Sequence, residues 1–192
     1  MKFDAVIIGG GKAGFAAACK LQEAGKKCAV IARGRSLRDT ERFVFVECGG
    51  TVLNGDVATG GVWDGPRFVG VTTRNLAPTL LEADNFILAT GKFFSKGLVA
   101  TMDKVTEPVF GSDVEFDEDR TKWFNPDFYG QQPFELFGVK TDGEQRVSIG
   151  GVISENLYAA GEILAGIGGV GAENNEKIEQ SAIAAAQRIL EK

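Results

Sequence analysis

Residues 3–14 read FDAVIIGGGKAG, and this stretch decides the fold. Its first part, residues 3–8, is a short apolar run, which predicts a parallel strand buried on both faces. Residues 9–11 are all glycine and predict a tight turn. Residues 12–24 place small and apolar side chains at helical spacing, and residues 27–32 form a second apolar run. The stretch therefore predicts a strand, a turn, a helix and a second strand.

The glycines of this turn follow the spacing GxGxxG, at Gly9, Gly11 and Gly14. Gly9 lets the chain turn tightly, Gly11 lets the backbone approach a pyrophosphate, and Gly14 lets the helix pack close to the strand. The unpaired amides of the first helical turn, from Lys12 and Ala13 onward, would then face the phosphates. The motif's place between a strand and a helix predicts dinucleotide binding.

The second strand ends in Ala32, Arg33 and Gly34, where an acidic residue normally accepts the ribose hydroxyls of a dinucleotide. We expect these three residues at the adenosine end of the ligand. Arg33 is compatible with a 2′-phosphate, which would indicate NADP, with the adenosine or a terminal phosphate of a flavin, and with a solvated position on the surface. The sequence leaves these alternatives open.

Length and charge narrow the class of protein. The chain has 192 residues, a net charge of -5 and a pI of about 4.9. This size predicts one domain, residues 1–192, and the acidic balance argues against nucleic acid as a partner. No apolar run approaches the roughly 20 residues that cross a bilayer, and no secretory signal opens the chain, so we expect a cytoplasmic protein without direct membrane insertion.

Few side chains are suited to catalysis or metal binding. The chain has no histidine, and the spacing of Cys19, Cys28 and Cys48 matches no zinc site or disulfide framework. We interpret the cysteines as reduced packing residues and expect neither a metal site nor a catalytic side chain. Any chemistry must come from a cofactor, a carboxylate or a partner chain.

The middle of the chain departs from a simple alternation of strands and helices. Residues 43–47, 60–63 and 68–73 are short β-type runs separated by turn signals. They predict a three-stranded β-meander within residues 43–75. Residues 92–145 are rich in aromatic side chains and predict an irregular excursion packed by its rings, or alternatively a docking surface for another subunit.

Two further strands are expected to end at the cofactor side of the sheet. Residues 82–91 end in Ala89, Thr90 and Gly91, and residues 156–162 end in Gly161 and Glu162. Apolar residues then recur at helical spacing toward the C-terminus and predict an amphipathic helix. The N-terminal dipole of this helix could point at a flavin and raise its reduction potential.

The order of these motifs resembles the two-dinucleotide-binding-domain flavoproteins. More closely, residues 86–100 (FILATGKFFSKGLVA), Glu107-Pro108 and residues 137–142 (FGVKTD) resemble the family formed by the B subunit of anaerobic glycerol-3-phosphate dehydrogenase. The resemblance covers residues 1–36 and 44–165. Members of that family carry a large middle region between the first βαβ unit and the meander, whereas here only about residues 37–42 join the two.

The resemblance implies an α/β fold, with an FAD/NAD(P)-binding Rossmann-like parallel sheet, a three-stranded β-meander and a C-terminal helix. It divides a single FAD-binding domain into a βαβ unit (residues 1–36), the meander (43–75), the excursion (92–145) and the flavin-side strand with its helix (156–192). The implied cofactor is FAD, with FMN as the alternative.

The resemblance also implies positions along the cofactor. Ala89, Thr90 and Gly91 would lie against its ribityl and phosphate portion, and the pair Gly161-Glu162 would meet a ribityl hydroxyl. The pair Asp56-Val57 would lie by the adenine. Independently of the resemblance, Lys92 and Lys96 flank Ser95 after the strand and are candidates for contact with an anionic substrate.

The function implied is an FAD-binding oxidoreductase subunit that takes electrons onto flavin and passes them to a partner. By resemblance, the partners are other dehydrogenase subunits, including a membrane-anchored iron–sulfur subunit that would place this chain at the membrane periphery. Two alternatives stay open: an FAD-binding module without turnover of its own, and an NADP-dependent reductase, which Arg33 alone favours.

Overall fold

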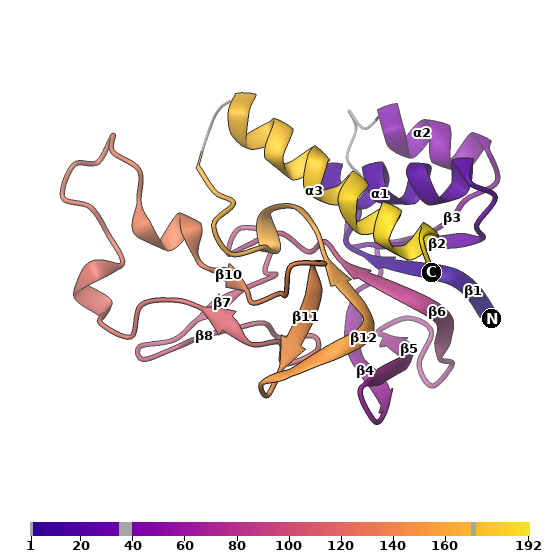
Figure 1. Ribbon diagram of the computed structural model, residues 1–192, viewed down its shortest axis with the longest axis horizontal. Coiled ribbons are helices and arrows are strands. Elements are labelled where there is room, and N and C mark those ends of the chain that lie inside the picture. The colour runs from indigo at the N-terminus through magenta and orange to yellow at the C-terminus, as the bar shows by residue number, and fades with distance from the viewer. Residues whose placement is uncertain (1, 35–39, 170–171) are drawn as a thin grey trace.

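The computed structural model describes residues 2–34, 40–169 and 172–192. Its centre is an eight-stranded sheet, whose main path has the order β11-β12-β6-β1-β2-β3 (Figure 1). The strands of this path are β11 (Arg146–Ile149), β12 (Val152–Ala159), β6 (Leu81–Leu88), β1 (Lys2–Ile8), β2 (Cys28–Ala32) and β3 (Thr51–Asn54). All neighbouring pairs from β12 to β3 are parallel, and β11 pairs with β12 in the antiparallel sense. The α/β class and the parallel Rossmann-like sheet are thus confirmed.

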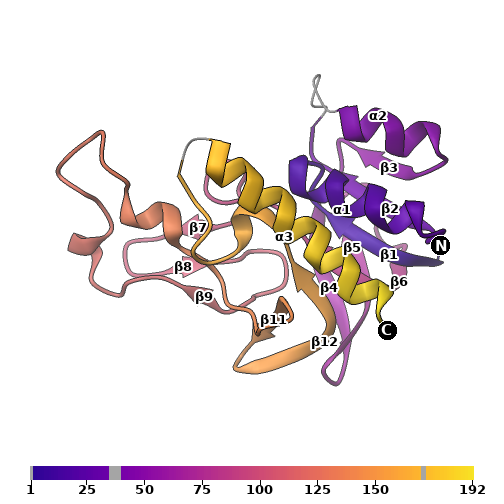
Figure 2. The same ribbon diagram turned by 45° about the horizontal axis from the view of Figure 1, so that its top comes forward.

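Three helices cover one face of this sheet, α1 (Lys12–Glu23), α2 (Thr40–Glu47) and α3 (Ala172–Leu190). Figures 1 and 2 show them on the same side in both views. Alternate residues of β1 explain how two cores form: Ala5 and Ile7 pack against the helices, whereas Val6 and Ile8 pack against the opposite layer. Burial on both faces is why the strand reads as a continuous apolar run.

The opposite face carries a β-meander. Strands β4 (Ala58–Asp64) and β5 (Arg67–Thr73) form an antiparallel pair, and β5 continues the antiparallel pairing onto the start of β6. Two of the three strands predicted for a meander within residues 43–75 are present as β4 and β5, whereas the third strand of the antiparallel run is β6, which lies outside those bounds and also belongs to the parallel sheet. Phe68 at its centre is fully buried and meets the rings of Trp63, Phe86 and Phe110 edge-on.

The prediction of a strand at residues 43–47 was wrong, because these residues form most of α2. Only Phe45 of this run is buried, and its ring centroid lies 6.0 Å from that of Phe15 on α1. The place beside β2 is taken by β3, which the sequence interpretation did not assign. Packing against α1 therefore overrides the β propensity of alternating aromatic and β-branched residues.

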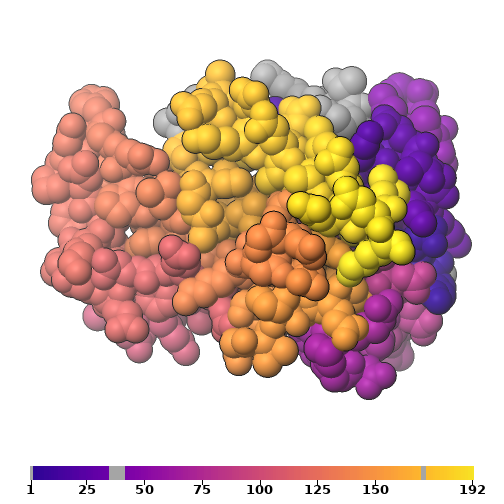
Figure 3. All heavy atoms as spheres, viewed as in Figure 1, coloured from indigo at the N-terminus to yellow at the C-terminus, as the bar shows by residue number. Residues whose placement is uncertain are grey.

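Residues 92–145 form the irregular excursion that their composition predicts. It contains β7 (Val99–Ala100), β8 (Val105–Thr106), β9 (Val114–Glu115), β10 (Gly138–Val139) and two 3₁₀ helices, Arg120–Lys122 and Pro133–Leu136. Trp123 packs edge-on against Phe137 and Phe116, with ring centroids 5.3 and 6.2 Å away. Figure 3 shows this segment at one end of the molecule, away from the helices α1 and α2.

A buried asparagine ties the meander to the parallel sheet. Asn156 on β12 is fully buried, accepts a hydrogen bond of 2.8 Å from the Phe68 amide, and donates to the carbonyls of Phe68 and Asp84 at 2.8 Å each. These bonds satisfy backbone groups where the meander leaves the ladder of the sheet.

We expect Asn156→Ala to lower the free energy of unfolding by about 3 kcal/mol, because it leaves buried backbone groups of Phe68 and Asp84 without partners. Urea unfolding monitored by circular dichroism measures this loss. Asn85→Ala is the matched control, since the Asn85 side chain bonds to no described residue, and it should cost less than about 1 kcal/mol. Equal losses in the two variants would contradict this role for Asn156.

Candidate functional site

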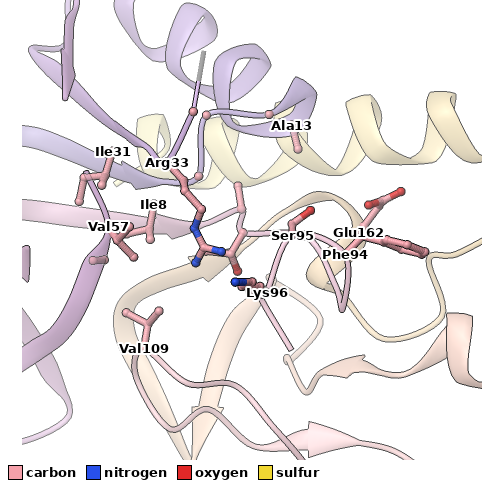
Figure 4. Close-up of a pocket in the computed structure, with 18 of the residues that line it drawn as sticks. Ile8, Ala13, Ile31, Arg33, Val57, Phe94, Ser95, Lys96, Val109 and Glu162 are labelled. Carbon is pink, nitrogen blue, oxygen red and sulfur yellow. The ribbon is translucent and has the colours of Figure 1, made fainter. Parts of the chain in front are cut away.

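A cavity of about 780 Å³ lies at the carboxyl ends of β1, β2 and β6. Open parallel sheets bind ligands at this edge. Most of the predicted site residues line the cavity, namely Gly9, Gly11, Lys12, Ala13, Arg33, Gly34, Asp56, Val57, Ala89, Thr90, Gly91 and Glu162. Figure 4 shows Arg33 and Val57 at one side and Glu162 at the other, with Ala13 above. The sequence thus predicted a set of residues that the fold brings together.

The GxGxxG glycines have different tasks. Gly9 has a φ of +121°, and a Cβ built on it would stand 2.1 Å from the Ala89 carbonyl oxygen. A Cβ on Gly14 would stand 1.9 Å from the Gly9 carbonyl oxygen. Both glycines are therefore required by the packing of the chain itself. A Cβ on Gly11 would meet no atom within 4 Å. Gly11 is thus free of such a constraint within the fold and borders the cavity.

Gly11 is also the N-cap residue of α1, and no side chain caps this helix end. The amides of the first helical turn have no partner within the helix, and they carry the positive end of its dipole. Such an end favours an anion, and a glycine at the N-cap lets a phosphate come close to the backbone. This geometry fits the pyrophosphate of a dinucleotide.

Three predicted site residues do not line the cavity, Gly14, Ala32 and Gly161. Each one packs behind its wall. A Cβ on Gly10 would stand 2.5 Å from the Ala32 Cβ, and a Cβ on Gly161 would stand 2.5 Å from the Ala13 Cβ. These small residues set the spacing of the wall by their packing.

The Asp56 carboxylate is held by hydrogen bonds within the wall of the cavity. Its buried carboxylate accepts hydrogen bonds from the Thr73 hydroxyl at 2.6 Å and from the amides of Val57 and Asn75 at 2.8 and 3.0 Å. Burial acts to raise the pKa of Asp56, but these bonds outweigh it and hold the pKa below its ordinary value. The ionised side chain fixes the turn between β3 and β4.

The far end of the cavity carries Thr90, Gly91 and Glu162. The Thr90 hydroxyl is buried and has no hydrogen-bond partner among the described residues. A Cβ on Gly91 would lie 3.7 Å from a carboxylate oxygen of Glu162, so this exposed acid stands close to the strand end. An orphaned hydroxyl and a carboxylate at the same end of one cavity suit a ligand that carries hydroxyl groups.

The excursion supplies a wall that the sequence interpretation did not foresee. Pro108 and Val109 line the cavity, and the buried Glu107 carboxylate holds their turn by accepting bonds from the amides of Val109 and Phe110 at 2.7 and 2.8 Å. The pair Glu107-Pro108 was the sequence signal for this wall. The resemblance included this pair, but the sequence analysis assigned it no role. Asn175 brings the first turns of α3 to the same cavity.

The two candidate lysines lie in different environments. Lys96 lines the cavity, whereas Lys92 is buried and its ammonium donates to the Glu135 carbonyl on the excursion. Burial lowers the pKa of Lys92 to about 8, and the nearby carboxylates of Glu162 and Glu135 partly oppose this shift. Lys92, the first residue of the excursion, thus ties the end of β6 to Glu135 further along the excursion.

The described residues outside the cavity also bear on membrane spanning and on metal binding. In residues 2–34, 40–169 and 172–192, no helix is long and apolar enough to span a membrane, and no group of three or more histidine, cysteine or acidic side chains could hold a metal ion. Burial raises the pKa of the Cys28 thiol to about 12, with Asp4 adding to the shift and Lys26 opposing it. Cys28 is a protonated packing residue at neutral pH.

Comparison with known proteins agrees with the dinucleotide site that this cavity indicates. Residues 4–43 and 37–174 match the family model of the FAD binding domain. The chain belongs to this FAD-binding domain family. Membership assigns FAD as the cofactor, and the shape of the glycine turn, the uncapped helix end and the Thr90 hydroxyl fit that group.

Relatives of this FAD-binding domain are longer than the chain. The B subunit of anaerobic glycerol-3-phosphate dehydrogenase from Vibrio vulnificus (strain YJ016) is 39% identical over 150 residues, which cover 76% of this chain and 34% of the relative. The same subunit from Actinobacillus succinogenes is 40% identical over 134 residues, which cover 67% of this chain and 31% of the relative. The chain spans about a third of the length of the curated relatives that it matches. The predicted resemblance is confirmed.

A solved structure gives the same fold. The GidA-related protein from Thermus thermophilus superimposes with a TM-score of 0.59 at 16% identity, over 98% of both chains. At this identity the likeness bears on the fold alone, and it agrees with the Rossmann-like architecture.

Substitutions at Gly14, which the packing requires, and at Gly11, which borders the cavity, should have different effects on stability and on FAD binding. We expect Gly14→Ala to destabilise the fold, by about 2 kcal/mol or more, since its Cβ would overlap the Gly9 carbonyl oxygen. Gly11→Ala should leave the melting temperature within about 2 °C of the wild type and weaken FAD binding at least about tenfold, because its Cβ would enter the space for the phosphates. Thermal unfolding and FAD titration measure the two effects. A Gly11→Ala variant that binds FAD normally would contradict the assignment.

Proposed function

We propose that this chain is a redox subunit that holds FAD in the cavity at the carboxyl ends of β1, β2 and β6, with residues 1–192 acting as one domain. The observation that carries the proposal is the continuity of this cavity, from Arg33 past the uncapped end of α1 to Glu162. It offers a cation at one end, backbone amides in the middle and a carboxylate at the other end. That order matches the parts of a flavin dinucleotide.

Each part of the wall would then have a task. Arg33, Gly34 and the backbone at Val57 would hold the adenosine half, and the backbone from Gly11 to Ala13 would bind the pyrophosphate. Thr90 would donate to the ribityl chain through its free hydroxyl, and Glu162 would accept from a ribityl hydroxyl. FAD, when bound, supplies the electron and hydride transfer, so the chain itself needs no acid or base of its own.

The flavin end of the cavity is open. Phe94 lines the cavity and is fully exposed, and Val99, which also lines the cavity, is exposed as well. An open mouth lets a partner chain approach closely enough to deliver or collect electrons. The relatives are named as one subunit of a dehydrogenase, which supports transfer to other subunits.

The same open mouth favours a second candidate, an FAD-binding module without turnover. An active site that closes over its substrate expels water and so protects reactive intermediates from side reactions. The exposed rim at Phe94 does not enclose a substrate, and the chain spans about a third of the length of its curated relatives. The substrate-covering part could be supplied by another chain.

Anaerobic reduction distinguishes the two candidates. The FAD-loaded chain is mixed with glycerol 3-phosphate, with glycerol as the matched control, and the visible flavin absorbance is followed. A redox subunit with its own donor site bleaches with glycerol 3-phosphate and recovers when a dye acceptor is added. Bleaching by dithionite alone would overturn oxidation of this donor by the isolated chain and favour the module without turnover of its own.

A further inference from the structure

The turn after β6 holds Lys96 in a backbone conformation that favours glycine. Its φ is +59°, in the left-handed region. The Lys96 amide donates to the Phe93 carbonyl at 3.0 Å, and the Gly97 amide donates to the Lys92 carbonyl at 2.9 Å, so the turn is closed on both sides. A residue with a Cβ adopts this region at an energetic cost, and such costs collect at functional sites.

Gln145 shows how the energetic cost of a positive φ can be offset. Among the described residues, Gln145 is the one other non-glycine with a positive φ, at +62°. Its side-chain amide donates to the carbonyls of Ala159 and Ser181 at 3.1 and 3.0 Å, so hydrogen bonds inside the protein offset its strain. The Lys96 side chain has no such partner among the described residues, although it lines the cavity.

A second cation faces Lys96 from the opposite wall. Figure 4 shows the Arg33 guanidinium, which comes from the end of β2, pointing toward the Lys96 ammonium. Neither side chain forms an ion pair or hydrogen bond with a described residue. Both residues are exposed, so solvent screens the repulsion between their charges, and an anion held between them would be attracted by both.

The other charged groups of the wall do not supply that anion. Lys12 is itself a cation, paired with Glu179 at 3.2 Å, and the Asp56 carboxylate is occupied by three donors. Glu162 lies at the far side, beside Phe94 and Ser95. The space between Arg33 and Lys96 therefore lacks a negative charge from the described chain.

We propose that Arg33 and Lys96 form a two-sided site for a phosphate group of a ligand bound in the cavity. A guanidinium binds two phosphate oxygens at once, and an ammonium adds a compact charge from the other side. The proposal rests on the proposed function, since the phosphate can belong to FAD itself or to a second, phosphorylated ligand that binds beside it. Lys96 is then a binding residue on the turn that follows Thr90-Gly91.

Variants at position 96 separate binding from folding. Lys96→Gly removes the cation and the backbone strain together, so we expect a higher melting temperature but about tenfold weaker binding of the phosphate-bearing ligand. Lys96→Arg keeps the charge and should bind within about threefold of the wild type. Arg33→Gln should weaken binding like Lys96→Gly. Lys104→Gln changes an exposed lysine outside the cavity and is the matched control. It should change neither the melting temperature nor the binding of the ligand.

Two titrations identify the source of the phosphate. Apo chain is titrated with FAD by flavin fluorescence, and FAD-loaded chain is titrated with inorganic phosphate while its absorbance is followed. Weaker FAD binding in Lys96→Gly and Arg33→Gln assigns the site to the cofactor. Unchanged FAD binding together with a lost response to phosphate assigns it to a second ligand.

The proposal is overturned if the wild type binds FAD and both variants match it in the two titrations. If the wild type binds no FAD, the proposed function fails, and the site is tested alone by calorimetric titration of the apo chain with inorganic pyrophosphate. Pyrophosphate binding that is lost in Lys96→Gly and Arg33→Gln supports the site, and equal binding or no binding in all three overturns it.

Discussion

The close approach of three backbone segments at Gly9 is the constraint on which the site depends. Carbonyl oxygens of Ala89 and Gly9 occupy the places where side chains at Gly9 and Gly14 would stand. This contact holds the end of β1, the start of α1 and the end of β6 in one cluster. The first turn of α1 and the Thr90-Gly91 end therefore border one cavity, and this candidate site follows from a packing requirement.

The rest of the chain builds on that cluster. The helices bury one face of the parallel strands, and the meander and excursion bury the other. Buried polar groups at Asn156 and Glu107 fix the points where these irregular segments meet the sheet. The excursion consequently reaches back to the cavity, where Val109 forms part of its wall. The cavity and the core packing thus share the same contacts, while Phe94 at the rim of the cavity stays exposed.

Local patterns predicted the elements that depend on local rules. The glycine motif, the apolar strands on both sides of α1 and the amphipathic α3 follow from period and turn chemistry. Residues 43–47 were misjudged because their alternation fits a strand, while the contact of Phe45 with Phe15 makes them helical. Val109 was missed because the excursion places it by long-range packing, and the sequence could not tell the cavity-lining Lys96 from the buried Lys92, since the left-handed turn that separates them is not encoded in a linear pattern.

The most direct test of FAD binding is the visible absorption spectrum of the purified chain, with the released cofactor identified by mass. We predict a flavin spectrum, either as purified or after addition of FAD, and the mass of FAD in the released fraction. A chain that stays colourless after incubation with FAD, or that releases only FMN, would contradict the assignment of the cavity to a flavin dinucleotide.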